Sequence, residues 1–145
     1  MEAMSASDLV EERCRTLPDC QVTRKGEWVS VTPTHVNSFE VGYQFFNNLH
    51  TVNFLGWHED FSSRDEALNC FAFGLSAQCR LRVWLKGKFQ YRWALEGRDE
   101  AGKWYEDSRT GLVFFPYWKR TSVVVLQNDL LKQPWPEFSV SRLET

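Results

Sequence analysis

The chain has 145 residues, a mass of 17.1 kDa and a formal net charge of −2. Hydrophobic residues make up 43% and charged residues 25% of the chain, a balance typical of one globular domain that excludes disordered, collagen-like and coiled-coil proteins. No apolar run approaches the roughly 20 residues that a membrane span needs, so we expect no membrane partner. The first residues lack the basic start and apolar stretch of an export signal, which predicts a cytoplasmic protein.

Four cysteines, at positions Cys14, Cys20, Cys70 and Cys79, are predicted to be free thiols. An even number of cysteines indicates disulfides mainly in small exported chains, and an export signal is not evident here. Five residues separate the first two cysteines and eight separate the last two, whereas the cysteines of zinc-binding pairs are about two to four residues apart. We therefore expect no metal site and no cofactor.

The first half of the chain predicts one short helix followed by strands. Apolar residues recur at helical spacing over residues 5–17, and the period changes to two over residues 28–32 and 39–45. The pair Asn47-Asn48 tolerates positive φ angles and predicts a tight hairpin into a third strand over residues 50–55.

A second helix is predicted to begin after Ser63. The run from Ser63 to Glu66 has the capping-box pattern, in which the serine hydroxyl and the glutamate carboxylate satisfy free backbone N–H groups of the first turn. The apolar stripe that follows extends the helix to about Ala77. Gly74 lies inside this stripe and is expected to weaken the helix by ~1 kcal/mol relative to alanine.

Residues 79–127 are predicted to form an antiparallel meander. Keeping the apolar side chains of the first hairpin on one face favours a three-residue connection, Lys86-Gly87-Lys88, and places Arg82 directly opposite Arg92. Residues 112–115 and 123–126 lack polar alternation, so we predict strands that are covered on both faces.

Charge pairing predicts the register of the next hairpin. Glu96 is placed opposite Lys103, which also places Arg92 opposite Asp107. The same register puts Trp104 on the buried side of the sheet.

Together these elements predict an α+β fold. We expect a curved antiparallel sheet of about six to eight strands, with the N-terminal helix and the central helix packed on one face. A sheet so rich in aromatic residues could instead curl into a partly closed β-barrel around a cavity. We expect residues 1–145 to form a single domain, whose C-terminal tail, from about residue 133, is held extended by its prolines.

The predicted sheet of the second half carries a basic and aromatic face. Five cationic residues and no acidic residue occur between positions 80 and 92. Guanidinium groups bind oxyanions in a bidentate manner, and aromatic rings offer a stacking plane. We therefore predict a non-catalytic binding or protein-interaction module that contacts an acidic protein or an anionic small molecule. Its predicted binding residues are Arg80, Arg82, Trp84, Arg92, Tyr105 and Arg109.

Other interpretations stay open at this point. The basic face could be a solvated surface whose charges are balanced by Glu106, Asp107 or the acidic first half of the chain. Alternatively, His58, Glu59 and Asp60 could serve as acid or base in a small hydrolase or isomerase, with its site in the mouth of the curved sheet. The net charge disfavours nucleic acid as a partner, and a second copy of the chain, giving a homodimer, is a further candidate.

Overall fold

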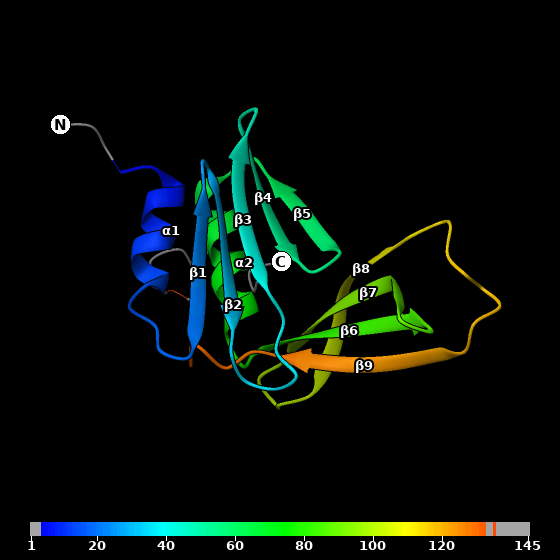
Figure 1. Cartoon of the computed structure of the whole chain (residues 1–145). Coiled ribbons are helices and arrows are strands. Elements are labelled where there is room, and N and C mark those ends of the chain that lie inside the picture. Colours follow the sequence, from blue (N-terminus) through cyan, green and yellow to red (C-terminus); the bar gives the residue numbers. More distant parts are fainter. Residues whose placement is uncertain (1–3, 133–134, 136–145) are drawn as a thin grey trace.

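The computed structural model describes residues 4–132 and Trp135, so most of the predicted tail lies outside the described residues. The described part of the chain contains two helices and nine strands in two antiparallel sheets (Figure 1). The predicted α+β class is therefore confirmed, and the strands divide between a five-stranded and a four-stranded sheet. Within these residues neither sheet closes into a barrel.

The five-stranded sheet follows the order of the chain. Its strands are β1 (Cys20–Lys25), β2 (Trp28–Pro33), β3 (Val41–Phe46), β4 (Leu49–Phe54) and β5 (Trp57–Phe61). The predicted hairpin turn is confirmed, with φ angles of 52° at Asn47 and 62° at Asn48. The sequence pattern does not reveal β1 or β5, because an ionisable residue, Arg24 or Glu59, takes a position on the inner face of each strand.

Helices α1 (Ala6–Cys14) and α2 (Arg64–Leu75) pack on the same face of this sheet (Figure 1). The Ser63 hydroxyl accepts a hydrogen bond from the backbone N–H of Glu66, which confirms the predicted start of α2. Both helices end earlier than the apolar pattern predicts, since α1 ends at Cys14 and α2 at Leu75. The core between helices and sheet includes the buried residues Val10, Val29, Val31, Val41, Tyr43, Val52, Phe54, Leu68 and Phe71.

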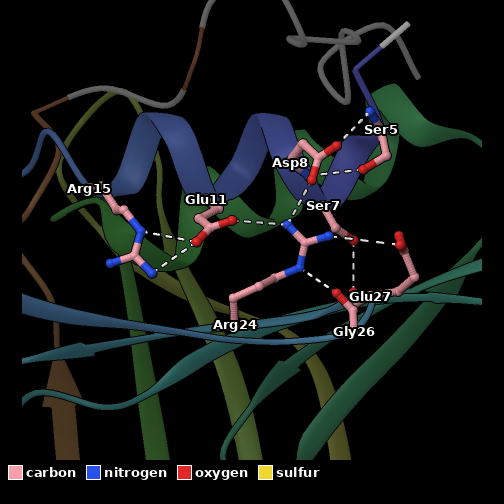
Figure 2. Close-up of polar contacts among 8 residues, drawn as sticks. All are labelled: Ser5, Ser7, Asp8, Glu11, Arg15, Arg24, Gly26 and Glu27. Atoms are coloured by element: carbon pink, nitrogen blue, oxygen red, sulfur yellow. Dashed lines mark hydrogen bonds and ion pairs between the residues drawn. The ribbon is translucent and has the colours of Figure 1, made fainter. Parts of the chain in front are cut away.

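A polar cluster fixes α1 to the β1–β2 hairpin (Figure 2). The Arg24 guanidinium lies 2.9 Å from Oδ1 of Asp8 and 3.0 Å from Oε1 of Glu11, and its Nε donates to the carbonyl oxygen of Gly26. Asp8 also forms a capping box with Ser5 at the start of the helix. The hydrogen bond from Arg24 lowers the pKa of Asp8. One cation on the sheet therefore orients the first two turns of the helix.

The second sheet contains β6 (Cys79–Lys86), β7 (Phe89–Arg98), β8 (Trp104–Gly111) and β9 (Thr121–Gln127). Its order is β8-β7-β6-β9, so three strands form a meander and β9 returns to pair with β6. Two predictions are wrong here. Residues 112–115 form an exposed loop, and the central valines of β9 are exposed because β9 is an edge strand.

The predicted register of the β6–β7 hairpin is also wrong. Its turn has two residues rather than three, and the first of them, Gly87, adopts a φ angle of 63°. A β-bulge then inserts Tyr91 as an extra residue in β7 and returns the apolar side chains to one face. Arg82 consequently lies opposite Ala94 and does not face Arg92.

A second bulge, in β8, shifts the β7–β8 register. Glu96 lies opposite Glu106 rather than Lys103, and Trp104 lies opposite Arg98. The predicted charge pairing fails because Glu96 finds its counter-charge on β6, the other neighbouring strand. Trp104 therefore belongs to the outer face of the sheet and not to its buried side.

The two sheets meet at one end of the second sheet. Nε1 of Trp57 donates to Oγ of Ser108 over 2.7 Å. The Trp93 ring packs flat on Gly56, where a Cβ atom would come within 2.3 Å of it. Asn128, which follows β9 and is fully buried, bonds backbone groups of both α2 and the segment before β3. The other end of the second sheet projects from the body of the molecule (Figure 1).

Tyr43 and His50 form a buried polar pair on β3 and β4, in which the phenolic oxygen lies 2.6 Å from Nδ1 of the imidazole. Burial raises the pKa of Tyr43 to about 12, so the phenol keeps its proton at neutral pH. Burial also lowers the pKa of His50 from its ordinary value of 6.5, and the positive charge of Arg64 adds to this effect.

This pair should make stability depend on pH. Below about pH 6.5 the unfolded chain takes up a proton more readily at His50 than the folded chain does. We expect the free energy of unfolding to be constant above that pH and to fall as the pH drops from it toward the folded-state pKa. In His50→Gln, which keeps a polar partner for Tyr43 but does not titrate, this slope should disappear. Urea unfolding across this range measures both proteins, and identical slopes would contradict the assignment.

Candidate functional site

The outer face of the four-stranded sheet carries most of the predicted basic and aromatic residues, and we call it the Arg–Trp face. Directly opposed residues of neighbouring strands share a face, and Trp84 opposes Arg92 whereas Arg98 opposes Trp104. The other side of the sheet contributes Leu81, Val83 and Leu95 to the core. The Arg–Trp face comprises Arg80, Arg82, Trp84, Arg92, Glu96, Arg98, Trp104 and Arg109.

Five of the six predicted binding residues lie together on this face, and one does not. These five are Arg80, Arg82, Trp84, Arg92 and Arg109. They share the face although the predicted register is wrong, because a bulge changes which residues lie opposite each other while side chains beyond it still alternate between the two faces. The predicted placement of Tyr105 is wrong, since it lies opposite Gly97 on the other side of the sheet. Ligand binding by any of these residues remains a prediction.

Two guanidinium groups contact the Trp84 ring. The Cζ atom of Arg109 lies 4.9 Å from the ring centroid and that of Arg92 lies 5.7 Å from it. Ala94, opposite Arg82 on one side and Arg109 on the other, is fully buried beneath these long side chains. Such cation–π contacts are worth about 0.5–1 kcal/mol each at exposed sites. They hold the two guanidinium groups in place at the surface.

A second cluster of the same kind surrounds Trp104. The Cζ atoms of Arg80 and Arg98 lie 4.3 Å and 4.5 Å from its ring centroid. The period-two pattern does not reveal Trp104 as a member of the face, because the β8 bulge alters which residues of β8 point outward. Arg98 does follow Arg92 at period two on β7, so this signal was present in the sequence. The Arg–Trp face thus contains two indole rings, each in contact with two arginine side chains.

Glu96 supplies part of the counter-charge for this face. Its side chain is only 10% exposed, and its carboxylate oxygens lie 2.6 Å from Nε of Arg80 and 3.4 Å from an Nη of Arg82. Glu106 likewise pairs with Arg109 at 2.7 Å. The interpretation that acidic residues of the chain balance the face is therefore correct for these three arginines, although Glu96 is a partner that the sequence does not suggest.

Arg92 and Arg98 differ from the other arginines of the face. Neither makes an ion pair with a described residue, and each lies against an indole ring. They are six residues apart on β7, with Ala94 and Glu96 between them on the same face. The face therefore retains two cations whose guanidinium groups are free to bind an external anion.

The loop between β8 and β9, residues 112–120, forms an exposed aromatic and cationic tip, which we call the tip loop (Figure 1). Phe114 and Trp118 are 88% and 72% exposed. Phe115 anchors the loop by stacking on Tyr91, with ring centroids 4.4 Å apart. Exposed cations of the tip loop and of the adjacent turn are Lys88, Lys119 and Arg120. The sequence signal for this surface is the absence of any acid between Asp107 and Asp129.

The alternative acid–base residues lie on β5 and do not converge. His58 and Asp60 point to the outer face of the five-stranded sheet, whereas Glu59 lies opposite the buried Val52 and points to the inner face. Asp60 accepts a hydrogen bond of 2.6 Å from the Thr51 hydroxyl. His58 is exposed, and its Nδ1 lies 3.4 Å from a backbone carbonyl oxygen. The three side chains therefore do not form a common site.

The four cysteines are free thiols, as predicted. Burial raises the pKa of Cys14 to about 12 and raises the pKa values of Cys20 and Cys79 as well, so these thiols stay protonated at neutral pH. Within the described residues, no three His, Cys, Asp or Glu side chains are grouped so that they could hold a metal ion.

Neither of the two described helices has the length and hydrophobicity of a membrane-spanning helix. No protein-family model matches the chain, and the searches of curated proteins and of solved structures also return no match. The geometry of the Arg–Trp face is therefore the basis on which a function can be proposed.

Proposed function

We propose that this protein is a non-catalytic intracellular binding module whose Arg–Trp face contacts an acidic segment of a partner protein. The observation that carries this proposal is the placement of Arg92 and Arg98, which have no described acidic partner and are each held against an indole ring. A guanidinium group that is already oriented loses less conformational entropy when it binds a carboxylate.

The extent of the face favours a protein over a small molecule. Arg92 and Arg98 are six residues apart on β7, which corresponds to about 20 Å at roughly 3.4 Å per residue. Sites for small molecules are typically concave and bring their polar groups together. Two cations separated by this distance on an open sheet are better suited to several carboxylates along a protein surface.

Two further observations support the remaining parts of the proposal. The side chains of His58, Glu59 and Asp60 do not converge, and the buried thiols stay protonated. The described residues therefore offer no evident catalytic group. Four free cysteines, three of them buried, are compatible with a reducing compartment and hence with an intracellular location.

Reversing the two free cations should abolish binding of an acidic ligand. We expect Arg92→Glu/Arg98→Glu to weaken binding of poly-L-glutamate at low salt by tenfold or more, about 1.4 kcal/mol, since two attractive contacts become repulsive. The control variant, Lys25→Glu/Lys132→Glu, makes the same charge change at exposed sites outside the Arg–Trp face. Isothermal titration calorimetry measures the affinities, and circular dichroism verifies that both variants are folded.

The outcome that rejects this proposal is equal affinity of the two double variants for the polyanion, because binding would then depend on overall charge alone. Saturable binding of inorganic pyrophosphate that needs Arg92, without binding of poly-L-glutamate, would also reject a protein partner and would indicate a small anionic ligand instead. Tryptophan fluorescence provides an additional measurement. A change on binding that is absent in Trp84→Phe comes from Trp84 and reports contact at this face.

A further inference from the structure

The two sheets have four edge strands, and one of them differs from the others. β1 carries Arg24 and Lys25, β5 carries three consecutive ionisable residues, and β8 carries charges and a bulge. Charges and bulges on edge strands oppose pairing with other chains. β9, with the sequence TSVVVLQ, has no charge, no proline and an uninterrupted register with β6. Of the described edges, β9 therefore lacks these protections.

The outward hydrogen-bonding groups of β9 can be identified from one contact. The backbone N–H of Gln127 donates to the carbonyl oxygen of Asn37 over 2.8 Å, so it points away from β6. Alternate residues of a paired strand direct their backbone groups to opposite sides. Thr121, Val123 and Val125 therefore also direct their N–H and C=O groups away from β6. Val123 and Val125 are 45% and 42% exposed, so this edge is open to solvent.

We propose that β9 pairs in an antiparallel manner with β9 of a second copy of the chain. Such pairing joins the two four-stranded sheets into one continuous sheet across a two-fold axis, in which both copies use the same surface. The proposal does not depend on the function of the Arg–Trp face.

The open part of the edge is symmetric about Val123. The contact with Asn37 closes the edge at Gln127, which leaves Thr121, Val123 and Val125 as open positions. When Val123 lies opposite Val123 of the second copy, Thr121 lies opposite Val125 of that copy, and the reverse. Each of these pairs exchanges two backbone hydrogen bonds, so every open position is satisfied in this register.

The charges around β9 are compatible with self-association. Arg82 and Lys86 lie on β6, one strand away from the edge. Three strand spacings, about 14 Å in total, separate them from their counterparts in the second copy, which exceeds the Debye length of about 8 Å at physiological salt. Antiparallel pairing also places Lys119 and Arg120, which precede β9, beside the C-terminal end of β9 in the second copy. The exposed Asp129 follows that end of the strand. The paired segments themselves contain no charge.

Analytical ultracentrifugation of the full chain tests this proposal. We expect the mass to approach twice the chain mass of 17.1 kDa as the concentration rises. Val123→Lys should return it to the chain mass, because two ammonium groups would meet at the axis. Thr23→Lys, the same addition on the edge strand β1, should leave the dimer intact. Val123→Thr preserves the shape and the N–H group, and it should also remain dimeric.

Hydrogen exchange and a proline variant keep the test informative if a lysine at this edge disturbs folding. The amides of Val123 and Val125 should be protected in the dimer and should exchange rapidly in Val123→Lys. Val123→Pro removes an outward N–H and no bond to β6, so it should be folded and monomeric. A chain that stays monomeric at all concentrations, with rapid exchange at these amides, overturns the proposal. A dimer that persists in Val123→Lys and Val123→Pro overturns it as well.

Discussion

Asn128→Ala should lower the free energy of unfolding by about 3 kcal/mol or more. The side chain is fully buried, and its Oδ1 accepts from the N–H of Phe39 while its Nδ2 donates to the carbonyl oxygens of Phe39 and Gly74, each over 3.0 Å. Alanine leaves three backbone groups without partners, and each unsatisfied buried group costs about 1–3 kcal/mol. Urea denaturation followed by circular dichroism measures the loss.

A second asparagine provides a matched control. Oδ1 of Asn53 is buried without a hydrogen-bond partner among the described residues. Its removal should relieve part of a desolvation cost, so we expect Asn53→Ala to change stability by less than about 1 kcal/mol. Similar losses in Asn128→Ala and Asn53→Ala would show that the three hydrogen bonds do not contribute as argued.

Gly74→Val should lower the free energy of unfolding by about 3 kcal/mol, since overpacking costs typically 1–3 kcal/mol and occasionally more. A Cβ atom at this position would come within 2.3 Å of Cε1 and 2.4 Å of Cζ of Phe54, which is fully buried. Gly74→Ala should also be destabilising, though less so. Helix propensity alone predicts the opposite sign, a gain of ~1 kcal/mol for alanine. Chemical denaturation of both variants distinguishes the two effects.

The steric origin of this loss can be tested by a compensating change. Phe54→Leu removes the ring atoms that the new Cβ would contact, so Gly74→Ala should cost less in that background than in the unmodified chain. A double-mutant cycle measures the difference. If Gly74→Ala is more stable than the unmodified protein, α2 does not pack as closely on β4 as the structure indicates.

The elements that follow from local physics could be predicted from the sequence. The Ser63 cap and the Asn47-Asn48 turn each depend on a few adjacent residues, and both are confirmed. The division of the strands into two sheets could not be predicted in this way. It depends on contacts between distant segments, such as Trp57 with Ser108 and Trp93 with Gly56.

The strand registers failed for a specific reason. Each hairpin of the second sheet contains a bulge, and a bulge conserves the alternation of apolar and polar residues on both sides of itself while it changes the pairing. The bulges also explain why only part of the candidate site could be predicted. Period two identified Arg82 and Trp84 as neighbours on one face, but the membership of Trp104 and the role of Glu96 depend on the exact pairing.

A sequence change should affect folding differently at the two ends of the second sheet, one of which is packed on the body of the molecule while the other projects from it. Asn128, which follows β9, and the Trp93 ring on Gly56 join this sheet to the body of the molecule. Most residues of the tip loop, by contrast, are exposed to solvent. Substitutions and insertions in the tip loop can accumulate during evolution with little loss of folding. The tip loop can therefore diverge in sequence faster than the anchored part of the sheet.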